Sequence, residues 1–389
     1  MSKWSMQKLP KWIWIVIPVA LLLGSIALFL ATNPLKPLGV VAPPIEEVTV
    51  ERTILDEEGI HLTVRVNGSE PVRIAQVLVD DAYWQFTQKP EGPLTRLSSA
   101  KIDIPYPWVQ HELHEITIIT STGMTFSHTI EVAEPTPEWS IQRIAAYILL
   151  GIYIGVIPVA LGLLFYPYLR TLGSTGINFL LTLTIGLLFY LLIDTLQEGF
   201  EMSQQVAGVF NGNLLVWVTA GVAFLIIFAL GRRGGKAPEG LSLSTYLALG
   251  IGFHNLGEGL AVGAAMASGE AALGSFLVVG FTLHNLTEGI GIAAPLLNRK
   301  TKFRTFVFLT LLAGLPAAFG TLIGAFAYSP HWTAVLLAIG AGAILQVIVE
   351  VGTYLYKNTE TKSWFTVSNL TGFVLGIAIM YGTALLVAI

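Results

Sequence analysis

The stretch HNLGEGLAVG, residues 254–263, is followed in the next apolar segment by HNLTEGIGIA, residues 284–293. Each stretch interrupts a long apolar run with a histidine, an asparagine and a glutamate at the same relative positions. Ionisable side chains at membrane depth are costly, and by default they mark functional sites. The two stretches therefore predict a membrane protein whose polar site is formed by two neighbouring helices.

The composition supports a membrane protein that crosses the bilayer several times. Of the 389 residues, 53% are hydrophobic and only 12% are charged, whereas a soluble domain carries about 25% charged residues. The net charge of −4 gives no reason to expect a nucleic-acid partner. The chain has no cysteine, which excludes disulfides and thiolate metal sites, so nitrogen and oxygen ligands must hold any metal.

The N-terminal segment, residues 1–31, is predicted to be a membrane anchor. Three lysines, at positions 3, 8 and 11, precede an apolar run from Trp12 to Ala31. A secretory signal has an apolar core of roughly 7–15 residues and a small-residue cleavage site. The run is longer than that, so we interpret it as uncleaved; a long signal that is removed is the alternative. Residues 32–44 are rich in proline and are expected to be a linker.

Residues 45–134 are predicted to fold as a small β-sandwich of the immunoglobulin-like or fibronectin-like kind. Polar and apolar residues alternate in HLTVRV, RIAQVLV, HEITIIT and FSHTIEV, and turn sequences such as VNGSEP, QKPEGP and TSTG lie between them. Short alternating segments at this spacing are typical of such sandwiches. We interpret His111 and His114 of this domain as surface residues, because a metal site there is less consistent with their spacing.

Residues 135–389 are predicted to form a bundle of eight membrane helices, since an apolar helix needs about 20 residues to cross the hydrocarbon core. The expected helices span residues 140–168, 175–198, 212–231, 244–267, 272–297, 303–328, 332–356 and 364–388. Lys and Arg are concentrated in every second loop. The positive-inside rule then places the N-terminus in the cytoplasm and puts the β domain and the C-terminus outside. The expected location is the plasma membrane.

The repeated polar residues have the spacing of a metal site. Side chains three and four positions apart share one face of a helix, so each motif presents its three polar groups together, and the two motifs lie at matched depth. Imidazole, carboxylate and amide groups together suit a divalent cation. The predicted ligands are His254, Asn255, Glu258, His284, Asn285 and Glu288. Two copies of one face are hard to explain by helix packing alone.

Four further polar residues are predicted pathway or accessory positions. Asp194 and Glu198 lie near the end of the second helix of the bundle, and Gln346 and Glu350 share a face of the seventh. An acidic vestibule without a binding role is the alternative for the first pair. A packing role is the alternative for the second pair.

The motifs HNLGEG and HNLTEG resemble those of the ZIP (Zrt-, Irt-like) family of divalent-metal transporters, and most closely its ZupT and GufA-type branch, whose paired motifs read HNxPEG. The resemblance covers about residues 140–389. It implies an eight-helix bundle with a central two-metal site and import of zinc, iron, manganese and related ions. One ion would be bound by His254, Glu258, His284 and Glu288. The second would be bound by Asn255, Glu258, Asn285 and Glu288.

The chain departs from this family pattern at three places. Gly257 and Thr287 stand where the family motifs have proline. The sixth helix offers Ala317 and Ala318 where relatives often have a glutamate, which puts the second metal position in doubt. The loop GRRGGKAPEG lacks the histidines that many relatives carry there. The anchor and the β domain are additions to the family core.

The resulting prediction is a divalent-metal transporter, with zinc foremost and iron, manganese or cadmium also accepted, that moves the ion towards the cytoplasm. The metal is a substrate, and neither a prosthetic group nor an enzymatic activity is expected. One alternative is a membrane metal sensor that does not transport. A less favoured one is an intramembrane metallohydrolase, for which no HExxH motif is present. Whether the chain forms a homodimer, and whether the β domain binds an external partner, are left open.

Overall fold

The computed structural model describes residues 13–32, 45–136, 138–232, 235, 237–267, 271–297, 300–327, 329–358 and 366–385. It divides into two compact units, Met1–Ile45 and Glu46–Ile389. In the first unit, α1 (Ile13–Thr32) is an apolar helix of 20 residues, as expected for an anchor. The N-terminal lysines and all but the first residue of the predicted linker lie outside the described residues.

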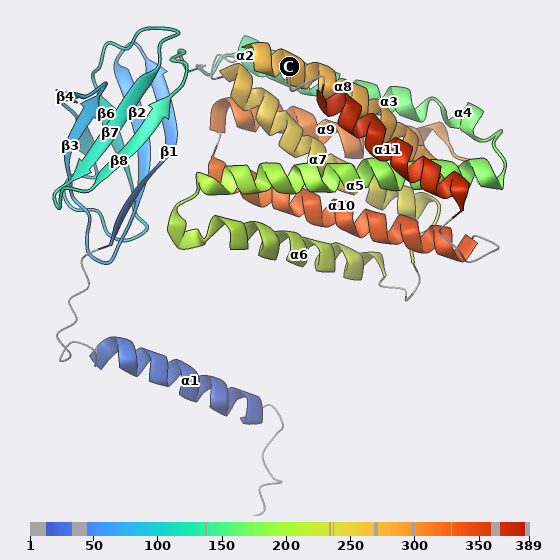
Figure 1. Cartoon of the computed structure of the whole chain (residues 1–389), viewed down its shortest axis with the longest axis horizontal. Helices are drawn as coiled ribbons and strands as arrows, with labels where there is room; N and C mark the ends of the chain where they lie inside the picture. Colours follow the sequence, from blue (N-terminus) through green and yellow to red (C-terminus); the bar gives the residue numbers. More distant parts are fainter. Residues whose placement is uncertain are drawn as a thin grey trace, which may run out of the picture. The chain divides into compact units, whose positions relative to one another are not determined.

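The second unit begins with a sandwich of two antiparallel sheets (Figure 1). One sheet has the order β1-β2-β6-β5, and the other has the order β4-β3-β7-β8. The strands are β1 (Glu46–Asp56), β2 (Gly59–Gly68), β3 (Ile74–Val79), β4 (Ala82–Trp84), β5 (Thr87–Lys89), β6 (Ser99–Ile104), β7 (His114–Thr120) and β8 (Thr125–Ile130). The predicted β-sandwich is confirmed.

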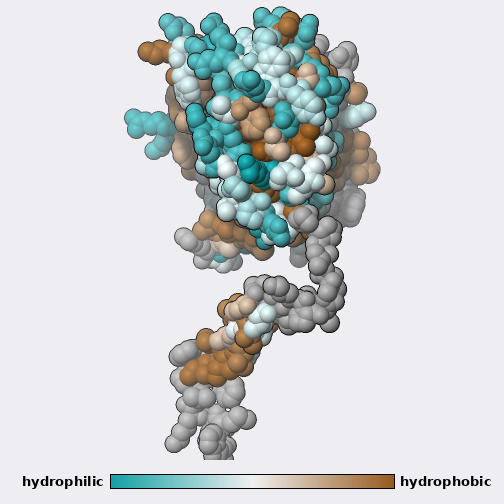
Figure 2. Space-filling view, turned by 90° about the vertical axis from the view of Figure 1, so that its left-hand side faces the viewer, coloured by the Kyte–Doolittle hydropathy of each residue, from teal (hydrophilic) through white to brown (hydrophobic). Residues whose placement is uncertain are grey.

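The sandwich forms because its strands alternate between a core face and a solvent face. In β2 the even-numbered residues from Ile60 to Val66 are fully buried or nearly so, and they pack against Ile116 and Ile118 of the other sheet. The opposite faces carry the polar residues, and the side of the sandwich seen in Figure 2 is mainly hydrophilic, whereas α1 is hydrophobic. Period-two alternation of this kind is what a half-buried strand requires.

One histidine of the sandwich differs from its prediction. His111 is exposed, as expected, but the surface interpretation of His114 is wrong. His114 is 2% exposed, its Nδ1 lies 2.7 Å from Asp80 Oδ2, and its Nε2 accepts a hydrogen bond from the Val109 amide. The reason is that His114 begins β7 on the strand face that turns towards the core.

The rest of the unit is a helical bundle with a helix in each of the eight predicted segments (Figure 1). Residue 328 at the end of the sixth segment, and residues 364–365 and 386–388 at the ends of the eighth, lie outside the described residues. The first segment is broken into α2 (Ile141–Gly151), a π-turn (Ile152–Val156), α3 (Ile157–Leu163) and α4 (Tyr166–Leu169). The others are α5 (Ser174–Gln204), α6 (Gly212–Gly231), α7 (Leu241–Ala267), α8 (Ala271–Ala293), α9 (Phe303–Ala327), α10 (Pro330–Asn358) and α11 (Val367–Leu385).

These helices have the length and composition of membrane spans. Seven segments of the described chain are long and apolar enough to cross a membrane. Helix α7, which carries the first polar motif, is not among them, but its 27 residues are long enough to span the hydrocarbon core. Many large apolar side chains, including Leu164 and Trp217, are exposed on the surface of the bundle, as expected where lipid covers them.

The centre of the bundle is built on close contact between α7 and α9. A Cβ atom added at Gly259 would overlap the Ala317 carbonyl oxygen, and one added at Gly320 would overlap the Leu256 carbonyl oxygen. Small residues permit this approach of two helix backbones. The contact fixes the rotation of α7, and with it the direction in which the polar motif faces.

Candidate metal centre

Three side chains of the two motifs meet inside the bundle. His254 Nε2 lies 2.9 Å from Glu258 Oε1, and His284 Nε2 of the neighbouring helix contacts the same oxygen. The ligand atoms of these three residues all lie within 4.8 Å of one another. One carboxylate oxygen is therefore shared by two imidazoles, one from its own helix and one from α8.

The cluster is isolated from solvent. His254, Glu258 and His284 are 2%, 1% and 7% exposed. A buried carboxylate is tolerated when it is paired and hydrogen-bonded, and here two imidazole nitrogens provide the pairing. Imidazole nitrogen and carboxylate oxygen are also the donor atoms that bind zinc when cysteine is absent. The same three groups can thus bind one another or a divalent cation.

Asn285 holds the second oxygen of the central carboxylate. Its Nδ2 donates to Glu258 Oε2 at 3.1 Å and to the Ile154 carbonyl at 2.9 Å. Ile154 lies in the π-turn of the first segment, four residues before Pro158. Proline has no N–H, so the Ile154 carbonyl lacks the donor that a regular helix would supply. The freed carbonyl instead positions Asn285.

Asn255 and Glu288 are buried but lie outside the three-residue cluster. Asn255 Nδ2 donates to the Ala313 carbonyl at 3.0 Å. Both carboxylate oxygens of Glu288 lack a hydrogen-bond partner in the described structure, as do the Oδ1 atoms of Asn255 and Asn285. Nearly all buried polar groups are hydrogen-bonded. Four acceptor oxygens without a donor are therefore free to coordinate a cation.

A residue missed by the sequence reasoning completes the surroundings of His254. Thr195 of α5 is fully buried, and its Oγ1 lies 2.8 Å from His254 Nδ1. With Nδ1 engaged by the hydroxyl, Nε2 faces Glu258. A hydroxyl beside a ring nitrogen selects the tautomer of the imidazole. The only sequence signal was the position of Thr195 next to Asp194, which was itself predicted as a pathway residue.

The two motif helices lie within a recognisable family region. Residues 233–384 match the family model described as ZIP Zinc transporter. The matched region includes α7 to α11 and so contains all six predicted ligands, whereas the β-sandwich and α2 to α6 precede it. A comparison with curated proteins found no match. The match and the apolar helices together support a multi-pass membrane protein.

Within the ZIP-matching region, the position of the missing sixth-helix carboxylate is filled by helix packing. Ala317 is fully buried and belongs to a small core with Ile154, Val262 and Phe281. A Cβ atom added at Gly155 would lie 2.8 Å from the Cβ of Ala317. Position 317 therefore lies in an apolar core, and α9 supplies no carboxylate there.

The four accessory positions separate into two groups. Asp194 and Glu198 are half-buried on α5, on either side of Thr195. Glu350 is fully buried and receives two hydrogen bonds from Arg232, at 2.9 and 3.1 Å. Gln346 is also fully buried, and its side-chain amide has no hydrogen-bond partner within the described residues. Neither Gln346 nor Glu350 joins the histidine–glutamate cluster.

Proposed function

We propose that the chain is a divalent transition-metal transporter that moves zinc or a similar ion towards the cytoplasm. The observation that carries the proposal is the buried meeting of His254, Glu258 and His284 on two helices of the ZIP-matching region. We further propose that Asn255, Asn285 and Glu288 contribute ligands, since their free oxygens lie on the same two helices. The plasma membrane, with the β-sandwich outside, is the proposed location.

Each residue of the cluster has a role in this proposal. Glu258 supplies the anionic oxygen, which contacts both imidazoles. Imidazole must be neutral to bind a metal, so metal arrival replaces the histidine–glutamate contacts and releases any shared proton. Asn285 keeps the Glu258 carboxylate oriented throughout, because it is anchored to the Ile154 carbonyl.

A transport assay tests the proposal. Uptake of zinc, iron, manganese and cadmium is measured in proteoliposomes for the wild type, Glu258→Gln and a matched control, Glu112→Gln, at an exposed position of the sandwich. We expect saturable uptake by the wild type and the control, and none by Glu258→Gln. The order of rates among the four ions identifies the preferred metal.

A membrane metal sensor is the second candidate function, favoured by the packing of Ala317, which leaves the site without a carboxylate from α9. Binding without flux separates the two functions. If purified wild type binds zinc, Glu258→Gln does not, and neither shows uptake, transport is excluded and the sensor is supported. Saturable uptake by the wild type excludes the sensor.

A further inference from the structure

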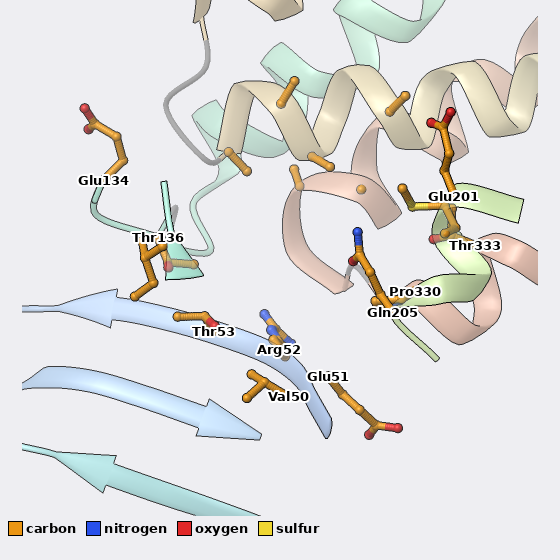
Figure 3. Close-up of a pocket in the computed structure, with 18 of the residues that line it drawn as sticks. Val50, Glu51, Arg52, Thr53, Glu134, Thr136, Glu201, Gln205, Pro330 and Thr333 are labelled. Atoms are coloured by element: carbon orange, nitrogen blue, oxygen red, sulfur yellow. The ribbon is translucent and has the colours of Figure 1, made fainter. Parts of the chain in front are cut away.

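A cavity of about 560 Å³ lies between the β-sandwich and one end of the helical bundle (Figure 3). On the sandwich side it is lined by β1, around Arg52 and Thr53, and by His128 of β8. On the bundle side it is lined by α5, α7, α9 and α10. We call this cavity the antechamber. It belongs to the second compact unit and is distinct from the buried cluster.

Arg52 connects the sandwich to the bundle, and a β-bulge in β1 sets the direction of its side chain. The register of β1 against β2 shifts between Val50 and Arg52. A bulge of this kind changes the direction of the side chains that follow it. Arg52 thereby reaches the bundle, and its guanidinium donates to the Phe326 carbonyl at 2.8 Å. Phe326 lies in the last turn of α9, where helix carbonyls lack partners and favour a cation.

Two further contacts hold the same strand in place. The Glu47 carboxylate accepts a hydrogen bond of 2.6 Å from the Gly208 amide, in the turn between α5 and α6. The connection to α2 is tied to β1 by two hydrogen bonds, one from the Leu55 amide to Thr136 Oγ1 and one from the Thr136 amide to the Leu55 carbonyl. Strand β1 is thus attached at its start, its middle and its end.

The antechamber reaches the level of the metal centre. Gly257, the residue before Glu258, lines it, and Ala261 and Ala264 of α7 follow on the same side of that helix. Glu198, one turn after Thr195 and Asp194, lines it from α5. The cavity therefore runs along the helix faces that lead to the ligands.

The polar groups that line the antechamber suit a cation. Glu198 and Glu201 line it from the bundle, whereas the guanidinium of Arg52 is directed at a carbonyl oxygen. Burial lowers the pKa of His128, so this imidazole is neutral near pH 7 and does not repel a cation. Carboxyl oxygens are suitable ligands for divalent cations, and Glu198 and Glu201 offer them on the bundle side.

We propose that the β-sandwich covers the antechamber as its roof, and that a hydrated divalent cation passes through the antechamber to reach the metal centre. The inference rests on the proposed function, because it assigns the external part of the same transport route. The sandwich then selects what approaches the bundle, by size and by charge, without binding the metal in a site of its own.

Cysteine labelling tests this route, because the chain has no cysteine of its own. Single variants Ala261→Cys, on the bundle wall, and Thr53→Cys, on the roof, are labelled with a bulky, membrane-impermeant maleimide. The matched control is Thr129→Cys, the neighbour of His128 on the exposed face of β8. Zinc uptake is measured in proteoliposomes before and after labelling. The rate of zinc association with the purified protein is measured in parallel.

We expect labelling at either antechamber position to abolish most of the uptake and to slow zinc association, and labelling of Thr129→Cys to change neither. If Ala261→Cys is fully labelled and both zinc uptake and zinc association are unchanged, the proposed route through the antechamber is overturned. If labelling abolishes zinc uptake by Ala261→Cys but not by Thr53→Cys, the proposal that the sandwich forms the roof of the route is overturned. If the unlabelled variants bind zinc but do not transport it, the proposed function fails, and the association rates alone decide whether the antechamber leads to the site.

Discussion

His284 of α8 and Glu258 of α7 are in direct contact through Nε2 and Oε1, and His254 shares that oxygen. The contact joins the two motif helices, as does the hydrogen bond from Asn285 Nδ2 to the other oxygen of the same carboxylate. Glu288, which occupies the equivalent motif position in α8, does not make the reciprocal contact, and its oxygens have no partner among the described residues. The two glutamates of a repeated motif are therefore not equivalent.

This asymmetry predicts that Glu258→Gln is more damaging than Glu288→Gln. Loss of Glu258 removes the shared anionic ligand, so zinc affinity should fall by more than the roughly 10–100-fold that loss of an outer partner costs. Glu288→Gln should reduce affinity by a smaller factor. Zinc binding to the purified variants measures both. Equal losses would show that the two carboxylates act as a symmetric pair.

Thr195 is predicted to hold His254 in the tautomer that binds metal. Nε2 can offer its lone pair only when the proton resides on Nδ1, which then donates to Thr195 Oγ1. Thr195→Val keeps the shape but removes the acceptor, and zinc affinity should fall about 10–100-fold, as for other outer-shell partners of metal ligands. Thr195→Ser should retain most of the affinity. Competition titration of zinc against a chelator distinguishes the two variants, and equal affinities would contradict the role.

Gly259→Ala is predicted to destabilise the bundle, because its Cβ would overlap the Ala317 carbonyl. Overpacking of this kind costs about 1–3 kcal/mol. Gly221→Ala in α6 is the matched control, since no atom lies within 4 Å of a Cβ there. Thermal unfolding in detergent should show a lower midpoint for the first variant and an unchanged or higher one for the second. A midpoint for Gly259→Ala equal to the wild type would contradict the close contact of α7 and α9.

The ion pair of Arg232 and Glu350 predicts that substitutions of the two residues have non-additive effects on stability. Arg232→Gln leaves the fully buried Glu350 carboxylate without its partner. Because the Arg232 side chain is 33% exposed, the cost should be below the about 3–5 kcal/mol of a pair that is buried on both sides. Adding Glu350→Gln removes the uncompensated charge, so the double variant should be more stable than Arg232→Gln alone. Unfolding midpoints of the wild type, both single variants and the double variant measure the coupling. Additive effects would show that the pair is not coupled.

The β-sandwich is predicted to lose stability as the pH rises above neutrality. Burial lowers the pKa of His61, but hydrogen bonds to Asp103 and Asp56 outweigh it and raise the pKa above its ordinary value, which is about 6.5. A histidine whose pKa is higher in the folded protein than in the unfolded chain stabilises the fold fully at a pH below its unfolded pKa of about 6.5. This contribution is lost as the pH rises through the pKa of the folded protein.

Hydrogen exchange of β2 in the full chain, corrected for the intrinsic pH dependence, measures this loss. His61→Gln should remove it, whereas His111→Gln, at an exposed position, should leave it unchanged. The same pH dependence in His61→Gln as in the wild type would assign the loss to another group.

Periodicity and spacing were sufficient to predict the elements of the fold. The alternation in HLTVRV fixes a strand with one buried face, and the apolar runs fix the membrane helices, because both depend on neighbouring residues of the same segment. The pairing of His254 with Glu258 also depends on one segment alone, since residues four apart share a helix face. The further prediction that all six motif groups converge on one or two ions stays a prediction.

Contacts between distant segments required the tertiary structure. Nothing local to Thr195 indicates that it reaches His254, and nothing local to Glu350 indicates that Arg232 is its partner. The bulge that directs Arg52 to Phe326 likewise depends on the register of two strands and on where α9 ends.

The sequence by itself determined which helices carry the polar groups of the candidate metal centre and which face of each helix presents them, because helical spacing is a property of one segment. Only the tertiary structure decided that Glu258, rather than Glu288, sits between the two histidines, and that Asn285 is anchored by the Ile154 carbonyl. The physical reason is that these choices depend on how far each helix is rotated and shifted against its neighbours. The glycine contacts of α7 with α9 and the Pro158 break in the first segment set that geometry.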